Sequence, residues 1–512
     1  MSIEQSLWDT ANQLRANSEL KSSEYSYPVL GLIFLKFADY KFTYLEKKLS
    51  SKFSKRNRKI GKEDYLAKGG LYLSSKARFK YLLQLPEGEN IGQRVNNAML
   101  LIEKDNPDLK DILPKIYNKF SNSLLIELIR LMDKIPMDIE GDAFGKIYEY
   151  FLGKFAMSEG QKGGEFFTPT SIVKLIVEII EPYEGRIYDP ACGSGGMFVQ
   201  SSRFVEEHKS NSSSKISIYG QERVADTVRL NKINLAVHGL AGDIKQSNSY
   251  YENLHNSINK FDCVMANPPF NVKKINKGKI KDDPRFPFGM PSVDNANYLW
   301  IQIFYSALNK KGRAGFVMAS SAVDAAGSEM EIRKKLIKSN VVDAIISIGP
   351  NFFYTVPLPC MLWFFDKAKK GKNRENKILF IDAREIYYQI DRIHREFTEQ
   401  QIKFLSNIVK LYRNEMIDIN DSTNELFSEK FPKKKYQDIL GLCKAETIDK
   451  IKLNDWSLNP ARYVGKSKST IKLGDINEEL KLSKNALDKL ESEARDLENK
   501  ISNNLSLFLK KK

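Results

Sequence analysis

The feature that most constrains the fold is a series of short β-rich runs that begins near residue 160 and alternates with segments long enough to form helices. Strands joined by crossover helices, such as the helix expected at Asp226–Val237, pair in parallel, because only a long connection returns the chain to the same edge of a sheet. We therefore predict an α/β domain with a mostly parallel, doubly wound sheet over residues 161–400. The expected strands are Arg186–Asp189, Ile216–Gln221, Phe261–Ala266, Ala314–Ala319, Val342–Ile348, Cys360–Phe365 and Ile378–Ile381.

The segments on either side of this domain have helical patterns. Apolar residues recur at helical spacing within residues 1–160, as at Leu7, Ala11 and Leu14, and this spacing predicts an all-α N-terminal domain. Residues 401–470 are predicted to form a helical and irregular C-terminal extension.

The apolar residues of segment 471–512 fall on a heptad, which predicts a coiled-coil-like C-terminal helix. A coiled coil needs a second helix, which a partner would supply. The alternative is a long amphipathic helix that packs on its own domain. The heptad positions are Leu473, Ile476, Leu480, Leu487, Leu490, Ala494, Leu497, Ile501 and Phe508.

Composition excludes several classes of protein. Hydrophobic residues make up 42% and charged residues 28% of the chain, which is the balance of a folded globular protein. No apolar run approaches the roughly 20 residues of a membrane span, and the N-terminal residues lack a secretory signal, so we expect a cytoplasmic protein. The 4 cysteines are widely spaced and only 4 histidines could join them as ligands, so we expect no metal site and no disulfide framework.

The chain is basic, with 80 Lys and Arg against 64 Asp and Glu, a formal net charge of +16. Such an excess favours a polyanionic partner, for example a nucleic acid. A Lys-rich composition also produces this charge in proteins that bind no nucleic acid, so the charge leaves both interpretations open.

A glycine-rich turn follows the first predicted strand. After Asp189 the chain continues through Pro-Ala-Cys to Gly193, Ser194, Gly195 and Gly196, and an apolar helix follows. Glycines let the backbone turn sharply and approach a ligand closely, and the N-terminus of the next helix attracts negative charge. The pattern predicts a nucleotide-type binding site.

Glu222 ends the second predicted strand, where an acidic side chain would accept hydrogen bonds from both hydroxyls of a ribose. It lies 33 residues after Asp189 (222 minus 189), further than the roughly 20 residues of the dinucleotide fingerprint. A polar insertion at Lys209–Lys215 accounts for the excess. The alternative is a surface glutamate that stabilises the start of a helix.

The motif with the most specific chemistry is Asn267, Pro268, Pro269 and Phe270, at the end of the strand Phe261–Ala266. The two prolines fix the backbone and remove two N–H groups, so the Asn267 side chain and the Pro268 carbonyl can accept both hydrogens of a planar amino group. Phe270 offers a stacking face for the attached ring. A weak amine nucleophile such as N6 of adenine needs this arrangement, with the base taken out of the duplex.

Taken together, these motifs resemble those of the S-adenosylmethionine-dependent DNA adenine-N6 methyltransferases. The stretch Gly-Glu-Phe-Phe-Thr-Pro-Thr at Gly164–Thr170 and the opening from Leu7-Trp8-Asp9 resemble, more narrowly, the modification (methyltransferase) subunit of type I restriction-modification systems. The resemblance covers nearly the whole chain, including Leu458–Val464 and the C-terminal helix. It implies a Rossmann-like methyltransferase domain between the helical N-terminal domain and the C-terminal arm.

The resemblance also implies roles for individual residues. Asn267, Pro268, Pro269 and Phe270 would be catalytic, on the target adenine. Whether Asp243 or Asn248–Ser249 contacts the adenine of the cofactor stays open. The residues that would bind S-adenosylmethionine are Glu165, Phe166, Phe167, Thr168, Pro169 and Thr170 beside its methionine part, Asp189, Gly193, Ser194, Gly195 and Gly196 in the turn, and Glu222 on its ribose.

The implied activity is methyl transfer from S-adenosylmethionine to N6 of a flipped adenine in double-stranded DNA, without a metal. The implied partners are a DNA-specificity subunit, with two copies of this chain for each, and a motor-nuclease subunit in the full complex. Two alternatives stay open: a methyltransferase that acts on a glutamine side chain of a translation factor, and a non-catalytic scaffold that helps a partner hold DNA.

Overall fold

The computed structural model describes residues 3–16, 22–53, 60–68, 70–86, 88–135, 143–159, 168–208, 215–292, 294–353, 358–417, 424–466, 484, 487–488 and 490–501. The chain divides into two compact units, Met1–Val464 and Gly465–Lys512. The predicted domain boundaries at residues 160 and 400 both fall within the first unit.

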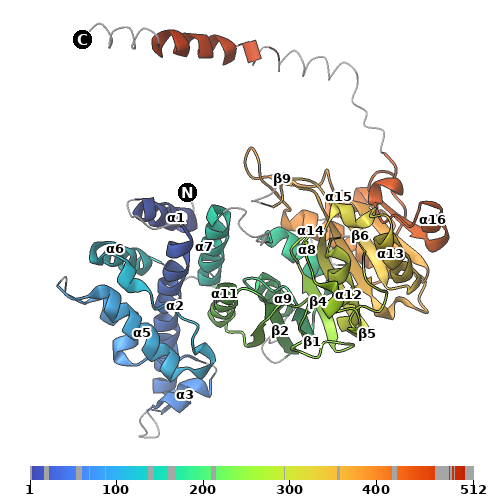
Figure 1. The fold of residues 1–512 in the computed structure, drawn as a ribbon. Helices are drawn as coiled ribbons and strands as arrows, with labels where there is room; N and C mark the ends of the chain where they lie inside the picture. The colour runs from blue at the N-terminus through green and yellow to red at the C-terminus, as the bar shows by residue number, and fades with distance from the viewer. Residues whose placement is uncertain are drawn as a thin grey trace. The chain divides into compact units, whose positions relative to one another are not determined.

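Within the described part of the chain, nine strands form one sheet in the order β11-β8-β6-β7-β5-β4-β1-β2-β3 (Figure 1). The prediction of a mostly parallel sheet is confirmed, because antiparallel pairing is limited to β7 with its two neighbours and to β11 with β8. The strands are β1 (Gly185–Asp189), β2 (Ile216–Glu222), β3 (Gly242–Gln246), β4 (Phe261–Ala266), β5 (Leu308–Ala319), β6 (Val342–Ile348), β7 (Cys360–Asp366), β8 (Lys377–Asp382) and β11 (Cys443–Thr447).

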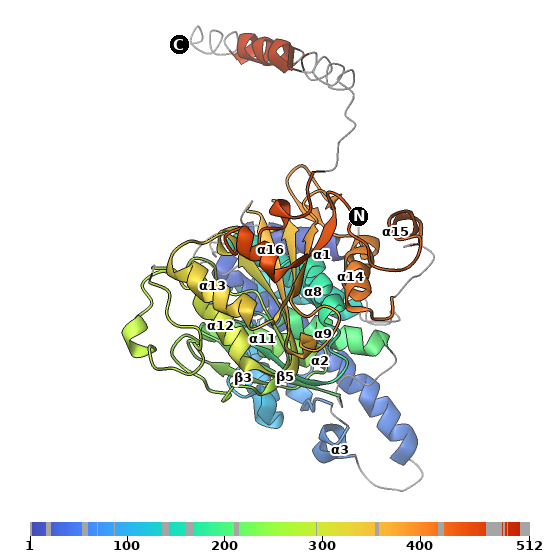
Figure 2. The same ribbon diagram turned by 90° about the vertical axis from the view of Figure 1, so that its right-hand side faces the viewer.

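Helices cover both faces of this sheet. Helices α8 (Thr170–Ile180), α9 (Gly196–Glu207), α11 (Ala225–Val237) and α14 (Glu399–Arg413) pack on one face, and α12 (Asn297–Ala307) and α13 (Ser328–Lys338) on the other (Figure 2). Successive strand residues point to opposite faces, so Ile187 and Tyr188 lie in different cores. Both cores are apolar, which explains why the strands carry near-continuous hydrophobic runs.

The N-terminal residues are helical, as predicted. Helix α2 (Ser22–Phe53) continues through Pro28, and its middle, from Leu30 to Leu35, is buried by the helices around it (Figure 1). Trp8 packs edge-on against Phe151 and Phe155. The other helices are α1 (Ile3–Ala16), α3 (Lys62–Leu66), α4 (Phe79–Leu83), α5 (Ile91–Asp105), α6 (Asn122–Asp133) and α7 (Ala143–Glu159).

One helix of the sheet domain also belongs to this N-terminal core. Ile233 and Val237 of α11 are buried among the N-terminal helices, whereas Val228 and Leu235 of the same helix lie in the core under the sheet. Nearby, Arg203 Nη1 lies 2.9 Å from Glu149 Oε2 of α7. Helix α11 therefore joins the two parts of the first unit.

The prediction for residues 401–470 missed a strand. Helices α14, α15 (Asn424–Lys430) and α16 (Ile448–Leu453) form, but Cys443–Thr447 pairs antiparallel with β8 as the sheet's edge strand β11. Strand β3 at the other edge was missed as well. The sequences of β3 and β11 contain few apolar residues, because an edge strand needs few apolar side chains. A small hairpin of β9 (Tyr388–Gln389) and β10 (Arg395–Glu396) was also not predicted.

In the second unit, residues 490–501 are helical. The heptad positions Leu487, Leu490, Leu497 and Ile501 are between 57% and 63% exposed, so within this unit no described element packs on the apolar seam. The seam positions Leu473, Ile476, Leu480 and Phe508 lie outside the described residues. None of the helices in the described part of the chain combines the length and the apolar composition that crossing a bilayer requires.

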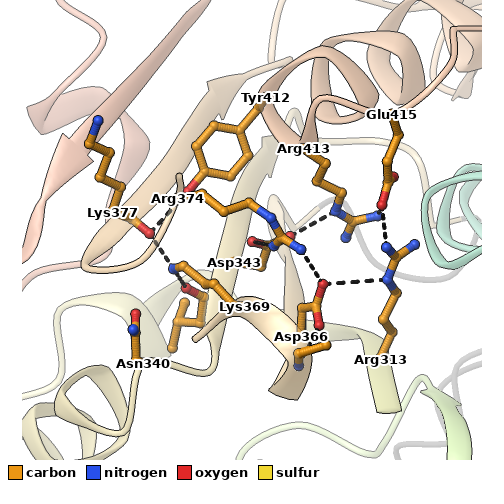
Figure 3. Close-up of polar contacts among 12 residues, drawn as sticks. Arg313, Asn340, Asp343, Asp366, Lys369, Arg374, Lys377, Tyr412, Arg413 and Glu415 are labelled. Atoms are coloured by element: carbon orange, nitrogen blue, oxygen red, sulfur yellow. Dashed lines mark hydrogen bonds and ion pairs between the residues drawn. The ribbon is translucent and has the colours of Figure 1, made fainter. Parts of the chain in front are cut away.

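A buried cluster of ion pairs lies where the amino end of β6 and the middle of β5 meet the carboxyl end of β7 (Figure 3). Asp343 of β6 is fully buried between Arg374 and Arg413, and its Oδ2 lies 2.8 Å from Arg413 Nε. Arg374 also pairs with Asp366 at the end of β7, and Arg313 of β5 lies 3.5 Å from the same carboxylate. The cluster thus links three strands to α14 and to the loop before β8.

We expect Asp343→Asn to lower the free energy of unfolding by about 3–5 kcal/mol, because it leaves two buried guanidinium groups without their shared carboxylate. Urea unfolding followed by tryptophan fluorescence would measure this, since Trp363 lies within β7. Asp226→Asn is the control. Asp226 forms an exposed pair with Arg229, and its loss should cost less than about 1 kcal/mol.

The destabilisation caused by Asp343→Asn should decrease as the pH falls. Burial alone would raise the pKa of Asp343, but Arg413 and Arg374 outweigh burial and lower the pKa from 3.8 to about 2. A carboxylate with a depressed folded-state pKa stabilises the fold above its unfolded pKa, and the contribution is lost as the pH falls through the folded pKa. The difference between the parent and Asp343→Asn should be complete at pH 7 and should shrink between pH 4 and 2. Equal urea midpoints for the two proteins at pH 7 would contradict the assignment.

Candidate active site

The predicted glycine turn lies at the carboxyl end of β1, and α9 begins at Gly196. Gly193 and Gly195 have φ of +48° and +86°, values that side chains disfavour. Asp189 is buried at the strand end and accepts a hydrogen bond from Ala191 N at 2.9 Å. Burial raises the pKa of Asp189, and the neighbouring charge of Glu222 raises it further. The local geometry is the strand, turn and helix that the sequence predicts.

Two buried asparagines hold the turn in place. From α11, Asn231 Nδ2 donates to Gly193 O at 2.9 Å and Asn234 Nδ2 donates to Ser194 O at 2.8 Å. A third bond joins Cys192 N to the carbonyl of Gln221 at 3.0 Å. Sequence analysis missed both asparagines. Their spacing of three residues, among the apolar residues that α11 buries, was the available signal, because polar side chains at buried positions need partners.

Glu222 lies against the same turn. Its Oε2 accepts from Gly193 N at 3.2 Å, and its Oε1 accepts from Val224 N at 2.9 Å. The carboxylate is half-buried at the end of β2, beside β1 in the sheet. Two of the predicted cofactor positions, 29 residues apart in sequence, are therefore in contact.

The turn leaves room for a ligand. A Cβ atom built on Gly193 or Gly196 would meet no heavy atom within 4 Å, whereas one on Gly195 would lie 3.2 Å from the Asn231 side chain. One side of the turn thus packs on α11, and the other has open space next to the Glu222 carboxylate. The site thus offers a carboxylate acceptor beside backbone that a ligand could approach closely.

The predicted target-base motif follows β4, which lies next to β1 in the sheet. Asn267 Nδ2 donates to Thr168 Oγ1 at 2.9 Å, so the amide is held from outside its own strand. Thr168 and Pro169 immediately precede α8, which begins at Thr170. This bond brings together two motifs 99 residues apart. Glu165, Phe166 and Phe167 lie outside the described residues.

Phe270 is half-buried and is supported by an aromatic residue that sequence analysis missed. The ring of Phe353, in the loop after β6, meets it edge-on at a centroid distance of 6.5 Å. The adjacent Phe352 packs against Phe397 at 4.5 Å. Pro268 is buried and Pro269 is half-buried. Nothing in the sequence near Phe353 distinguishes it from an ordinary core phenylalanine.

The two candidates for the contact with the cofactor's adenine lie at different ends of β3. Asp243 is near its amino end and pairs with Lys245 at 3.4 Å and His255 at 3.5 Å. Asn248 follows the carboxyl end, where Ser247 N donates to Glu222 O at 2.9 Å. Ligands of doubly wound sheets bind beyond the carboxyl ends of the strands. The Asn248 end of β3 is thus the end that borders the glycine turn.

Comparison with known proteins identifies the family. Residues 139–471 match the family model described as N-6 DNA Methylase, and residues 3–132 match the HsdM N-terminal domain. The chain is 37% identical to the type I restriction enzyme MjaIX methylase subunit of Methanocaldococcus jannaschii, over 98% of this chain and 90% of that protein. It is 36% identical to the HindI methylase subunit of Haemophilus influenzae, over 75% and 85% of the two chains.

A solved structure supports the fold. The methyltransferase subunit of the type I restriction-modification system from Streptococcus thermophilus superposes with a TM-score of 0.73 at 20% identity, covering 90% of this chain and 98% of that one. The matched family models and the two relatives show that the chain belongs to the N-6 DNA methylase family, as a methyltransferase subunit of the type I restriction-modification kind.

Proposed function

We propose that this subunit transfers a methyl group from S-adenosylmethionine to N6 of an adenine flipped out of double-stranded DNA, at a sequence chosen by a partner subunit. One observation carries the proposal. The glycine turn follows β1, Glu222 is the last residue of β2 and Asn267 follows β4. These strands are adjacent and parallel, so the groups suited to a nucleoside cofactor and to a planar amine lie together at the carboxyl ends of the strands.

The open side of the glycine turn and the Glu222 carboxylate would hold the cofactor, which supplies an activated methyl group when bound. Glu222 would accept from the ribose hydroxyls, the turn would contact the same ligand through its backbone, and Thr168 to Thr170 would border its methionine part. Asn248 is the better candidate for the contact with the adenine ring, because it is at the carboxyl end of β3.

At the target amine, the protein acts by orienting the amino group. The bond from Asn267 Nδ2 to Thr168 sets the amide so that its oxygen serves as the acceptor for N6–H, and the Pro268 carbonyl accepts the second hydrogen. Holding both hydrogens favours a nitrogen whose lone pair can attack. Phe270, braced by Phe353, would stack on the flipped base and help offset the few kcal/mol that unstacking costs. Positioning of this kind requires no histidine base.

The partners follow from the family and from the arm. Both relatives are named as subunits of type I restriction enzymes, which supports assembly with a DNA-specificity subunit and, in the full complex, with a motor-nuclease subunit. We propose two copies of this chain per specificity subunit. The exposed seam at Leu487 to Ile501 is suited to a helix of the specificity subunit, because its apolar residues keep heptad spacing.

Asn267→Ala should abolish methyl transfer and leave cofactor affinity nearly unchanged, because the side chain acts on the amine. The assay follows label from radioactive S-adenosylmethionine into DNA and into protein, with the subunit assembled with its specificity subunit. Label in protein but not in DNA would favour the glutamine-modifying alternative. Full activity of the variant would remove Asn267 from the catalytic role.

Glu222→Ala should weaken S-adenosylmethionine binding at least tenfold, because hydrogen bonds to a charged acceptor contribute about 1.5–3 kcal/mol each. Isothermal titration measures the dissociation constant. Glu331→Ala is the control: it removes an exposed acid from α13, on the other face of the sheet, and should leave the constant unchanged. Equal affinities of the Glu222 variant and the parent would place the ribose elsewhere.

Leu490→Asp combined with Leu497→Asp should prevent assembly with the specificity subunit while cofactor binding persists, because both charges enter the apolar seam. Ser492→Asp with Asn499→Asp is the control, since it adds the same charges at the same spacing on the polar side of the helix. Size-exclusion chromatography of the mixed subunits compares the two. Co-elution of the leucine variant would show that the seam does not bind the partner.

A further inference from the structure

A lysine-rich segment follows the target-base motif directly. Residues 271–281, here called the lysine segment, contain five lysines and no acidic residue. The lysines are Lys273, Lys274, Lys277, Lys279 and Lys281, and all of their side chains are exposed except that of Lys277, which is half-buried. Lys273 is three residues from Phe270, so the chain limits its Cα to at most about 11 Å from that of the aromatic residue.

The backbone of this segment is held by specific hydrogen bonds. At its start, Asn271 N donates to Asn297 Oδ1 and Asn297 Nδ2 donates to Asn271 Oδ1, both at 2.9 Å. Lys274 N donates to Asp294 Oδ1 at 2.6 Å. Asn276 N donates to the hydroxyl of Tyr251 at 2.9 Å. The lysine side chains therefore extend from an ordered backbone.

Arg285 follows the lysine segment by four residues, and its side chain is 1% exposed. Nη1 donates to Ser249 O at 2.7 Å and to Glu252 O at 3.3 Å, and Nη2 donates to Tyr250 O at 3.1 Å. Nε and Nη2 bind the carboxylate of Asp283, at 3.0 and 2.7 Å. Each of the five guanidinium N–H groups thus has an acceptor, and the fork geometry fixes Asp283 relative to the loop after β3.

The loop that Arg285 grips is the one that borders the cofactor site. Gln221, next to Glu222, is fully buried and donates from Nε2 to Ser247 Oγ at 2.7 Å and to Glu252 O at 3.1 Å. Glu252 O accepts from both Gln221 and Arg285. Arg285 also binds Asp283, whose N–H donates to Ile280 O of the lysine segment at 3.1 Å, so a continuous set of hydrogen bonds runs from the end of β2 to that segment.

We propose that Arg285 is a positioning residue, which holds the lysine segment against the DNA phosphates that flank the target adenine. The inference rests on the proposed function and adds to it the residues that grip the DNA backbone. A buried guanidinium is costly unless all its hydrogen bonds are made, so a simple packing role would be met more cheaply by an apolar side chain. Its directional bonds instead fix one loop relative to another, and the loop so fixed carries the positive charge that phosphates attract.

The first test removes charge. In the complex with the specificity subunit, Lys273→Gln with Lys274→Gln should weaken DNA binding roughly tenfold and reduce the slope of log K against log salt by about 2, one for each phosphate contact. The KM for DNA should rise, and kcat at saturating DNA should persist. Lys310→Gln with Lys311→Gln is the control, because those exposed lysines lie in the first part of β5, at the opposite edge of the sheet.

The second test is a double-mutant cycle. Arg285→Lys keeps the charge but loses the fork, and it should weaken DNA binding about as much as the lysine pair does. If Arg285 acts by placing those lysines, combining the three substitutions should cost little more than either change alone, because coupled residues are not additive. Asp283→Asn repeats the cycle with a milder change that leaves the guanidinium and its carbonyl contacts in place.

The double-mutant cycle gives different results if Arg285 positions the lysines and if it does not. Additive losses, or DNA affinity within twofold of the parent in both Arg285→Lys and Asp283→Asn, would overturn the inference. If Arg285→Lys fails to bind S-adenosylmethionine and so has not folded correctly, the Asp283→Asn cycle decides alone. The parent complex is first assayed for N6-methyladenine: absence of product there is a failure of the proposed function, whereas an additive cycle in an active parent is a failure of this inference.

Discussion

Parallel pairing of β4, β1 and β2 sets the relative positions of the motifs at the candidate active site. Asp189 is level with Gly220 in the register of β1 and β2, and Tyr188 is level with Val264 of β4. Because these strands run the same way, the glycine turn, Glu222 and Asn267 all lie at the carboxyl ends of their strands. A shift of one strand by a single residue would turn its side chains to the opposite face and separate groups that now touch.

Sequence patterns were sufficient for the central strands and for the motifs that follow them. Strands such as β6 and β7 are buried on both faces and can be recognised in the sequence by their near-continuous apolar runs, which Asp343 and Ser347 interrupt in β6. Edge strands β3 and β11 lack such runs, because each has a single neighbouring strand in the sheet order of the described residues and few of their side chains enter a core. The N-terminal helices were predictable from spacing, but the continuation of α2 through Pro28 was not.

The polar residues of the site that sequence analysis missed share one property. Asn231, Asn234 and Gln221 are buried side chains whose partners are distant in the chain. A polar residue within an apolar helix or at a strand end signals that some partner exists, but only the fold shows which one. The motif residues could be predicted because their chemistry is local, whereas the residues that support them depend on long-range packing.

Helix α11 makes structural contacts with three parts of the molecule. Ile233 and Val237 fill the N-terminal core, Val228 and Leu235 fill the core under the sheet, and Asn231 and Asn234 hold the glycine turn. A chimaera that replaced residues 1–160 with the helical domain of a relative would therefore graft a new surface onto half of a helix whose other half supports the candidate cofactor site. Such an exchange would also have to replace Ile233 and Val237, the α11 side chains that face the N-terminal helices. The segment to exchange therefore does not end at residue 160, the boundary that the sequence suggests.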